Sequence, residues 1–205
     1  IGTVTGDAPF SVHNRGRVGF VTTIVGRTWH LYTLAKLQLK LVGPEHPGLI
    51  QKVVNKGDLT IAAVGSMICV SKRAHLTQQC EEDADENFLE KTHGNVVDLV
   101  LVGDYLLSLH EKGKLVRWRI TKRSKETQDE GEGEAEEGGR LVYEDAIDLD
   151  TGFSPSCLCH PPAYLNKVIV GCRDDGRAQL WNVMTKKLVY AFDFGSGRLS
   201  DDEGE

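Results

Sequence analysis

Two cysteines and a histidine lie close together in the segment Cys157-Leu158-Cys159-His160, and zinc prefers such ligands. A closed zinc site needs further ligands at a matching spacing, and the sequence offers no second half of this kind. Cys157 and Cys159 are two residues apart, so they share one face of a strand. Since a free cysteine behaves as a small hydrophobic residue, we expect buried thiols and no metal site.

The number of cysteines limits the environment of the chain. There are five, which is an odd number for a chain of 205 residues. An odd count argues against a framework of disulfides and favours a reducing compartment. The five residues are Cys69, Cys80, Cys157, Cys159 and Cys172.

Motifs that would indicate catalysis are missing from the sequence. It contains no P-loop, no paired glycine-rich nucleotide fingerprint, no His-Glu-x-x-His motif and no Gly-x-Ser-x-Gly motif. The seven histidines are scattered, and none has an acidic and a nucleophilic residue at a recognised spacing. We therefore predict no catalytic residue and no cofactor, and an enzyme is the third alternative for the function.

Basic residues gather around one predicted strand and its exit. The cluster comprises Lys112, Lys114, Arg117, Arg119, Lys122, Arg123 and Lys125, and Trp118 lies between two of these residues in the sequence. It is either a solvated strand edge or a patch that contacts nucleic acid. Lys72 and Arg73 form a second, smaller basic spot. We predict partner or RNA contacts at Arg117, Arg119, Lys122, Arg123, Lys72 and Arg73.

Arg117 occupies a position where the strand pattern favours an apolar residue. A buried arginine without a partner is costly. Either a carboxylate pairs with it, or this face of the strand is open to a partner. The net charge of −6 and the pI near 5.7 do not suit extensive wrapping by nucleic acid. No apolar run approaches the length of a membrane span, and we expect no membrane partner.

These residues lie on a repeated element. "DDGRAQLWNV" and "EKGKLVRWRI" each place a tryptophan five residues after a glycine, Trp181 after Gly176 and Trp118 after Gly113. "VGRTWHLYTL" has Tyr32 in the aromatic position, and "VGSMICVSKR" is a degenerate copy with Ser71 there. Outside a low-complexity insert the period is about 40 to 47 residues, which is typical of the four-stranded blade of a WD-repeat propeller.

The repeat predicts the fold and the domain boundaries. We expect an all-β WD-repeat β-propeller with about four blades of a seven-bladed ring, because seven blades need about 300 residues. The predicted segments are blades one to three (1–122), an acidic disordered insert (123–140), blade four (141–194) and an acidic flexible tail (195–205). The glutamate- and glycine-rich insert cannot bury enough apolar surface to offset the entropy of ordering.

Within each blade the glycine is expected to form the turn between the two middle strands. The aromatic residue should close the third strand and pack between neighbouring blades. Tyr32, Trp118 and Trp181 are thus predicted to be packing residues, and Gly113 and Gly176 turn residues. We also expect His93, Ser108 and Trp118 to form part of a hydrogen-bonded relay, which Lys112 leaves incomplete because it replaces the usual turn aspartate.

Several stretches resemble one family beyond the general repeat. "VGRTWHLYTLAKLQLKLVGP" and "VGSMICVSKRAH" are similar to the first two blades of the U-three small nucleolar RNA-associated protein twenty-one family, tandem WD-repeat proteins of the small-subunit processome. The similarity is strongest in "FSPSCLCHPPAYLNKVIVGCRDDGRAQLWNVMTKKLVYAF". Ser71, Arg117 and the acidic insert depart from the family pattern.

The resemblance implies a non-catalytic scaffold in the nucleus and nucleolus that supports early pre-rRNA processing and small-subunit assembly. It implies other WD-repeat propeller proteins as partners, with mostly indirect contact to the U-three small nucleolar ribonucleoprotein and pre-rRNA. A different WD-repeat adaptor, which presents peptides or substrates in a ubiquitin ligase or a chromatin assembly, is the alternative.

Overall fold

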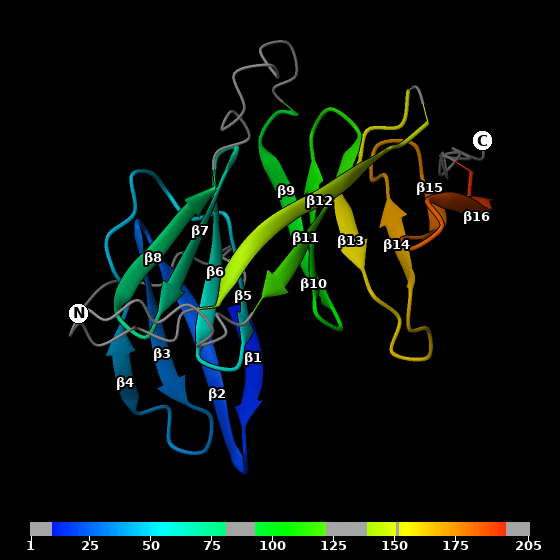
Figure 1. Cartoon of the computed structure of the whole chain (residues 1–205). Coiled ribbons are helices and arrows are strands. Elements are labelled where there is room, and N and C mark those ends of the chain that lie inside the picture. Colours follow the sequence, from blue (N-terminus) through cyan, green and yellow to red (C-terminus); the bar gives the residue numbers. More distant parts are fainter. Residues whose placement is uncertain (1–9, 81–92, 122–138, 151, 196–205) are drawn as a thin grey trace, which may run out of the picture.

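Sixteen strands form four antiparallel sheets in the computed structural model, which describes residues 10–80, 93–121, 139–150 and 152–195 (Figure 1). Short runs of β-branched and apolar residues between turns favour strands over helices. Within the described ranges there is no helix that could cross a membrane. The chain is thus an all-β protein with the four-stranded blades of a partial WD propeller.

Each of the first two sheets is a four-stranded meander. The first contains β1 (Phe10–Arg15), β2 (Val18–Val25), β3 (Thr28–Thr33) and β4 (Leu39–Val42). The second contains β5 (Lys52–Lys56), β6 (Leu59–Val64), β7 (Met67–Lys72) and β8 (His75–Cys80).

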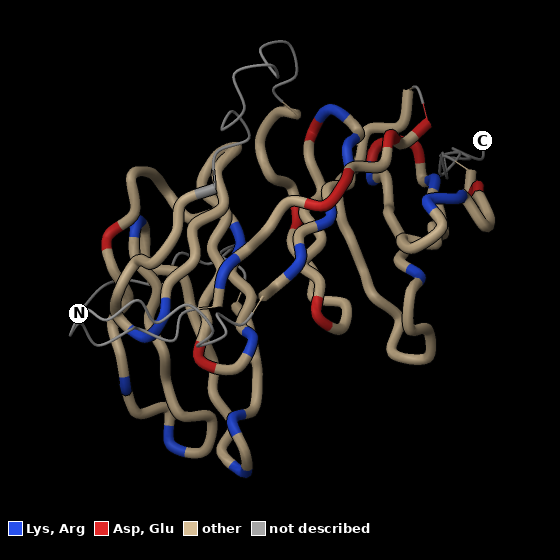
Figure 2. Tube along the Cα trace, viewed as in Figure 1, with Lys and Arg blue, Asp and Glu red and all other residues tan. Residues whose placement is uncertain are grey.

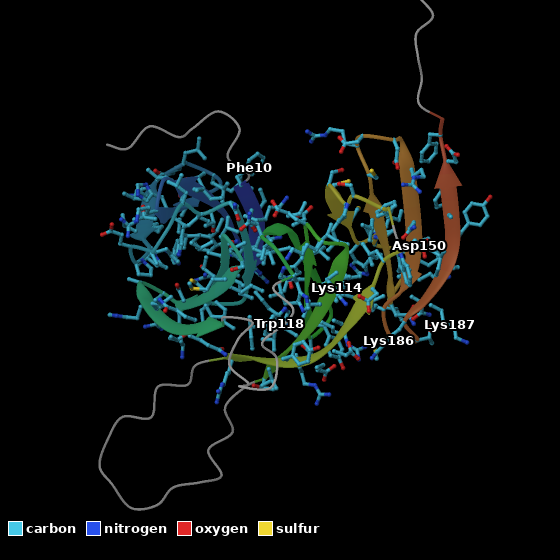
Figure 3. All side chains as sticks on the ribbon, turned by 90° about the horizontal axis from the view of Figure 1, so that it is seen from above. Phe10, Lys114, Trp118, Asp150, Lys186 and Lys187 are labelled. Atoms are coloured by element: carbon cyan, nitrogen blue, oxygen red, sulfur yellow. The ribbon has the colours of Figure 1, made fainter. Side chains whose placement is uncertain are left out.

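The third and fourth sheets repeat this order. The third contains β9 (Val96–Val102), β10 (Tyr105–His110), β11 (Lys114–Thr121) and β12 (Arg140–Asp148). The fourth contains β13 (Cys157–Cys159), β14 (Lys167–Gly171), β15 (Arg177–Asn182) and β16 (Lys187–Asp193). Viewed from above, the sheets form an arc, with the first strands near its centre and the fourth strands on its outside (Figure 3).

The predicted boundary between blades three and four is wrong. Residues 140–148 form β12, which pairs with β11 from Thr121–Arg140 to Lys114–Asp148, so they complete the third blade. Gln78 also exchanges two hydrogen bonds with the backbone of Leu141, which ties β12 to the second blade. The insert therefore separates two strands of one blade, and most of it, like the tail from residue 196, lies outside the described residues.

One irregularity recurs at the same place in every blade. The register between the third and fourth strands shifts between Leu31 and Tyr32, Val70 and Ser71, Arg117 and Trp118, and Leu180 and Trp181. In each case one extra residue of the fourth strand bulges opposite the closing position. Bulges of this kind bend a strand and increase its twist. The fourth strand of each blade therefore bends opposite the residue that closes the third strand.

Three hydrophobic clusters hold the four sheets together. Ile24 and Trp29 of the first sheet pack with Val53 and Cys69 of the second. The second cluster joins the second and third sheets and contains Trp118, and the third cluster joins the third and fourth sheets and contains Trp181. Trp118 and Trp181 are both buried and face the preceding blade, whereas Trp29 packs against the following one. Tyr32 is only half-buried, because no described residues precede the first blade.

Turn glycines occupy the left-handed region of backbone conformations. Gly113 has φ 74° and Gly176 has φ 66°, values that side chains with a Cβ rarely adopt. At Gly176 a Cβ would also lie 2.9 Å from the carbonyl oxygen of Gly195. Both conformational freedom and the lack of a side chain are therefore needed at Gly176.

A buried carboxylate connects the first strands of three blades. Asp98 of β9 pairs through Oδ1 with Lys52 Nζ of β5 at 2.7 Å. Its Oδ2 accepts a hydrogen bond of 3.0 Å from the backbone N–H of Leu158 in β13. Asp98 therefore fixes blades two, three and four at the inner side of the arc.

The prediction that the cysteines are buried holds for only part of the set. Cys69 and Cys172 are buried, but Cys157 and Cys159 are exposed. They flank the buried Leu158 on β13, so they lie on the face turned away from the third blade. Among the described residues no further blade covers that face, which explains their exposure.

We expect Trp181→Ala to destabilise the intact propeller by about 3–5 kcal/mol, because it empties the apolar contact between two blades. Trp181→Phe, the matched control, retains most of the ring but loses the hydrogen bond from Nε1 to Gln179 Oε1, 2.8 Å long, and should cost about 1 kcal/mol. Chemical denaturation measures both changes. A loss below about 1 kcal/mol for Trp181→Ala would remove this residue from the core.

Candidate interaction surface

Arg117 is part of a charged cluster between blades three and four. Its side chain is only 11% exposed, and Nη2 lies 2.7 Å from Asp145 Oδ2. Nε lies 3.2 Å from Glu144 Oε2, in an ion pair that lacks hydrogen-bond geometry. Nη1 donates to the carbonyl oxygen of Val183 in the fourth blade at 3.1 Å. Carboxylates therefore pair with Arg117, which is the first of the two alternatives for this residue, and its role as a partner or RNA contact stays a prediction.

Two further cations complete this Glu144–Asp145 cluster. Arg119 pairs with Glu144, although its own side chain is 56% exposed. Lys186, in the turn between β15 and β16, lies 2.9 Å from Asp145 Oδ2. Because the carboxylates belong to β12 and Lys186 belongs to the next sheet, the cluster links two blades at their outer side. Figure 3 places Lys186 beside the outer edge of the third blade.

Of the other predicted contact residues, Arg119 shares Glu144 with Arg117, whereas Lys72 and Arg73 lie on another blade. Lys122 and Arg123 lie outside the described residues. Lys72 ends β7, and the exposed Arg73 follows it in a turn with φ 55°. These two residues belong to the second blade, whereas Arg119 belongs to the third.

The predicted relay exists in altered form. Trp118 Nε1 donates to Ser108 Oγ at 2.9 Å, and Ser108 Oγ lies 2.9 Å from His110 Nε2. His110 Nδ1 lies 3.3 Å from the carbonyl oxygen of Gly94. His110, and not His93, is thus the partner of Ser108, while the ring of His93 meets that of His110 edge-on, with 5.7 Å between centroids.

The hydrogen-bond partners indicate the protonation of His110. Ser108 can donate to Nε2 because it accepts from Trp118, and a proton on Nδ1 then faces the Gly94 carbonyl. Burial lowers the pKa of His110 to about 4, although the Gly94 carbonyl raises it slightly and His93 lowers it further. The imidazole is therefore neutral at pH 7 and serves to position Trp118.

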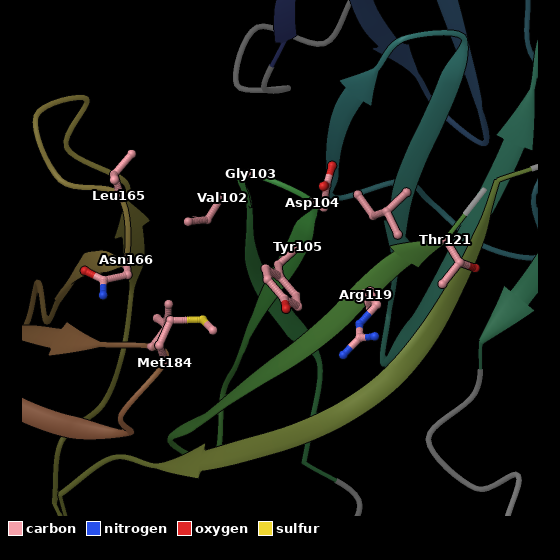
Figure 4. Close-up of a pocket in the computed structure, with 11 residues that line it drawn as sticks. Val102, Gly103, Asp104, Tyr105, Arg119, Thr121, Leu165, Asn166 and Met184 are labelled. Atoms are coloured by element: carbon pink, nitrogen blue, oxygen red, sulfur yellow. The ribbon is translucent and has the colours of Figure 1, made fainter.

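A cavity of about 620 Å³ opens between blades three and four (Figure 4). Its lining combines the turn at Val102–Tyr105 with Arg119–Thr121 of the third blade, and Leu165–Asn166 with Val183–Met184 of the fourth. Leu165 is 92% exposed, an unusual state for a leucine. The cavity is mainly apolar, with Arg119 as a cation in its wall.

Sequence reasoning missed the carboxylates and this cavity. Glu144 and Asp145 could have been found from the repeat. Each blade needs a fourth strand after its closing residue, and in the third blade only the segment that forms β12 could supply it. The cavity had no comparable signal, since its walls come from two blades and four separate segments. In the described part of the chain no group of three or more His, Cys, Asp or Glu residues could hold a metal ion.

Four-stranded blades with recurring closing residues define a WD-type propeller, and comparison with known proteins extends this to a family. The model of the WDR36/Utp21 first beta-propeller matches residues 21–201. The chain belongs to this family. In overall fold it is similar to a crystal structure of the computationally designed Ika8 protein, with a TM-score of 0.57, 14% identity and coverage of 89% of this chain and 48% of that chain.

Three curated relatives support the assignment. The U3 small nucleolar RNA-associated protein 21 homolog of Schizosaccharomyces pombe is 29% identical over 98% of this chain and 20% of its own length. The U3 small nucleolar RNA-associated protein 21 of Saccharomyces cerevisiae is 28% identical over 93% of this chain and 18% of its own. Human WD repeat-containing protein 36 is 28% identical over 84% and 16%. The chain thus spans a fifth or less of these relatives.

We predict that Arg117→Ala destabilises the propeller by about 3 kcal/mol, because it leaves two partly buried carboxylates without their shared cation. Arg119→Ala is the matched control on the same strand. It should cost less than about 1 kcal/mol because Arg119 is mostly solvated. Urea titrations of both variants measure the difference, and equal losses would show that Arg117 does not hold the cluster together.

The neutral state of His110 predicts a loss of stability in acid. In the unfolded chain the imidazole of His110 takes up a proton near pH 6.5, whereas in the folded protein it does so only near pH 4. Stability from this group is therefore complete above about pH 6.5 and decreases as the pH falls towards 4, by at most ~3 kcal/mol. Denaturation of the parent and of His110→Gln at several pH values tests this. If the variant shows the same decrease between pH 6.5 and 4, other groups cause it.

Proposed function

We propose that this chain is part of a non-catalytic scaffold subunit of the small-subunit processome, which supports early pre-rRNA processing and assembly of the small ribosomal subunit. The observation that carries the proposal is the match of one family model to residues 21–201. Two relatives in this family are named as U3 small nucleolar RNA-associated proteins. The nucleus, and within it the nucleolus, is the corresponding location.

The architecture supports a role in assembly. A propeller presents its turns and outer strands as separate surfaces on a rigid β framework, so several partners can bind at once. We infer that the partners are other WD-repeat propeller proteins, and that the U3 small nucleolar ribonucleoprotein and pre-rRNA are held mostly through them.

Exposed apolar faces at both ends of the arc support a larger ring. Phe10 and Val12 lie on the first strand, and Tyr190 and Phe194 lie on or directly after the last one, all largely exposed. Apolar faces of this extent need cover. Further blades of a seven-bladed ring would provide it, and the family name refers to a first propeller.

A second candidate function is that of a WD-repeat adaptor which captures a peptide. The mainly apolar cavity between blades three and four, with the exposed Leu165 in its wall, favours this alternative. The two functions differ in what they require: a peptide adaptor depends on this cavity, whereas a processome scaffold depends on the whole platform.

Depletion of the full-length protein should block early processing of the small-subunit rRNA precursor and leave the large-subunit pathway largely intact. Northern blots of the precursors measure both pathways in the same cells. Re-expression of the parent protein is the positive control, and a Leu165→Asp variant tests the need for the cavity. Normal small-subunit processing after complete depletion would favour the adaptor. Failure of the Leu165→Asp variant alone to restore processing would also favour it.

A further inference from the structure

Cations gather at one end of the first two blades. In an antiparallel meander the turn between strands one and two lies at the same end as the turn between strands three and four. In both blades these turns and the adjoining strand ends are rich in Arg and Lys (Figure 2). We call this surface the basic turn face; it comprises Arg15, Arg17, Lys36, Lys72 and Arg73.

The two blades contribute to one electrostatic environment. Burial lowers the pKa of Arg15, the carboxylate of Asp58 in the second blade raises it, and the guanidinium of Arg73 lowers it again. The first and second blades thus hold cations close enough to repel one another. The carboxylate of Asp58 offsets this repulsion at Arg15, and a bound anion would relieve the cations further.

Four of these five cations can be assessed for ion pairs within the described residues. In the part of the chain that the structure describes, no ion pair involves Arg15, Arg17, Lys36 or Arg73. The Nε atom of Arg15 is buried and has no hydrogen-bond partner there. This contrasts with Arg117, whose guanidinium is neutralised by two carboxylates.

The guanidinium of Arg15 is also held in place. It lies over the ring of Phe20, with Cζ 5.5 Å from the ring centroid, and the ring of His13 stacks on the same phenylalanine. A guanidinium fixed on an aromatic ring loses less conformational entropy when it binds an anion. Three of the five cations are arginines, whose planar donors match phosphate oxygens in pairs.

We propose that the basic turn face binds the phosphate backbone of RNA. The cations come from three turns in two blades, so they suit an extended chain of phosphates rather than a single anion. The choice of RNA over an acidic protein rests on the arginine content and on the proposed function in an RNA-based particle. The surface contains Lys72 and Arg73, which the sequence also predicted as contacts, and adds Arg15, Arg17 and Lys36 of the first blade.

Charge reversal in the full-length protein tests the proposal. The test variant is Arg17→Glu with Arg73→Glu, both on exposed turns of the basic turn face. The control is Lys112→Glu with Arg173→Glu, which removes the same charge from exposed turns at the opposite end. The probe is a fluorescein-labelled single-stranded RNA of about twenty nucleotides, followed by anisotropy over a range of KCl concentrations, and thermal melts confirm that both variants fold.

The test variant should bind the RNA roughly tenfold more weakly than the parent at about 0.1 M salt, and the slope of log K against log salt should fall by roughly 1.4 for two lost phosphate contacts. The control should retain the parental slope. Equal affinities of the two variants would overturn the proposal and leave the processing function untouched. Competition by polyglutamate as strong as that by unlabelled RNA would overturn it in favour of an acidic protein.

Discussion

A single buried carboxylate sets the spacing of the blades. Asp98 accepts from the ammonium of Lys52 and from the backbone N–H of Leu158, and these groups belong to the blades on either side of its own. A buried carboxylate needs such partners because its desolvation is costly. The first strands can therefore satisfy Asp98 only when all three blades are in place, which makes the inner side of the arc cooperative.

On the outer side of the arc, all four blades share one backbone feature, and the side chains beside it make different hydrogen bonds. The register shift opposite the closing position occurs in all four blades. Trp118 reaches Ser108 and His110, whereas Trp181 reaches Gln179, whose amide in turn donates to Asp150. Ser71 is fully buried at the same position. The bulge thus defines the blade, whereas the polar contacts of the closing side chain vary: both tryptophans donate a hydrogen bond, and the buried Oγ of Ser71 has no hydrogen-bond partner among the described residues.

The recurring glycine and closing residue could be predicted from the sequence because both are local: a positive φ at Gly113 or Gly176 and a residue of defined side-chain direction on the third strand. The blade boundary at 141 failed because the low-complexity insert separates β11 from its partner β12, so the pairing is not local. His110 was missed for a similar reason, since the pattern specified a histidine before the first strand and the chain uses one at the end of the second. The cavity depends on how two blades meet, which no single segment encodes.

Position on the blade determines what a cation does in this protein. Arg117 lies in the middle of a strand between two sheets, where an unpaired charge would be costly, and β12 supplies two carboxylates to it. Lys52 faces the inner side and is neutralised by Asp98. At the turns of the first two blades water can solvate a charge, so the fold does not require a carboxylate there. Some turn cations are nevertheless paired, as Lys186 is with Asp145, so it is the turns of the first two blades in particular that expose basic residues in a chain whose net charge is −6.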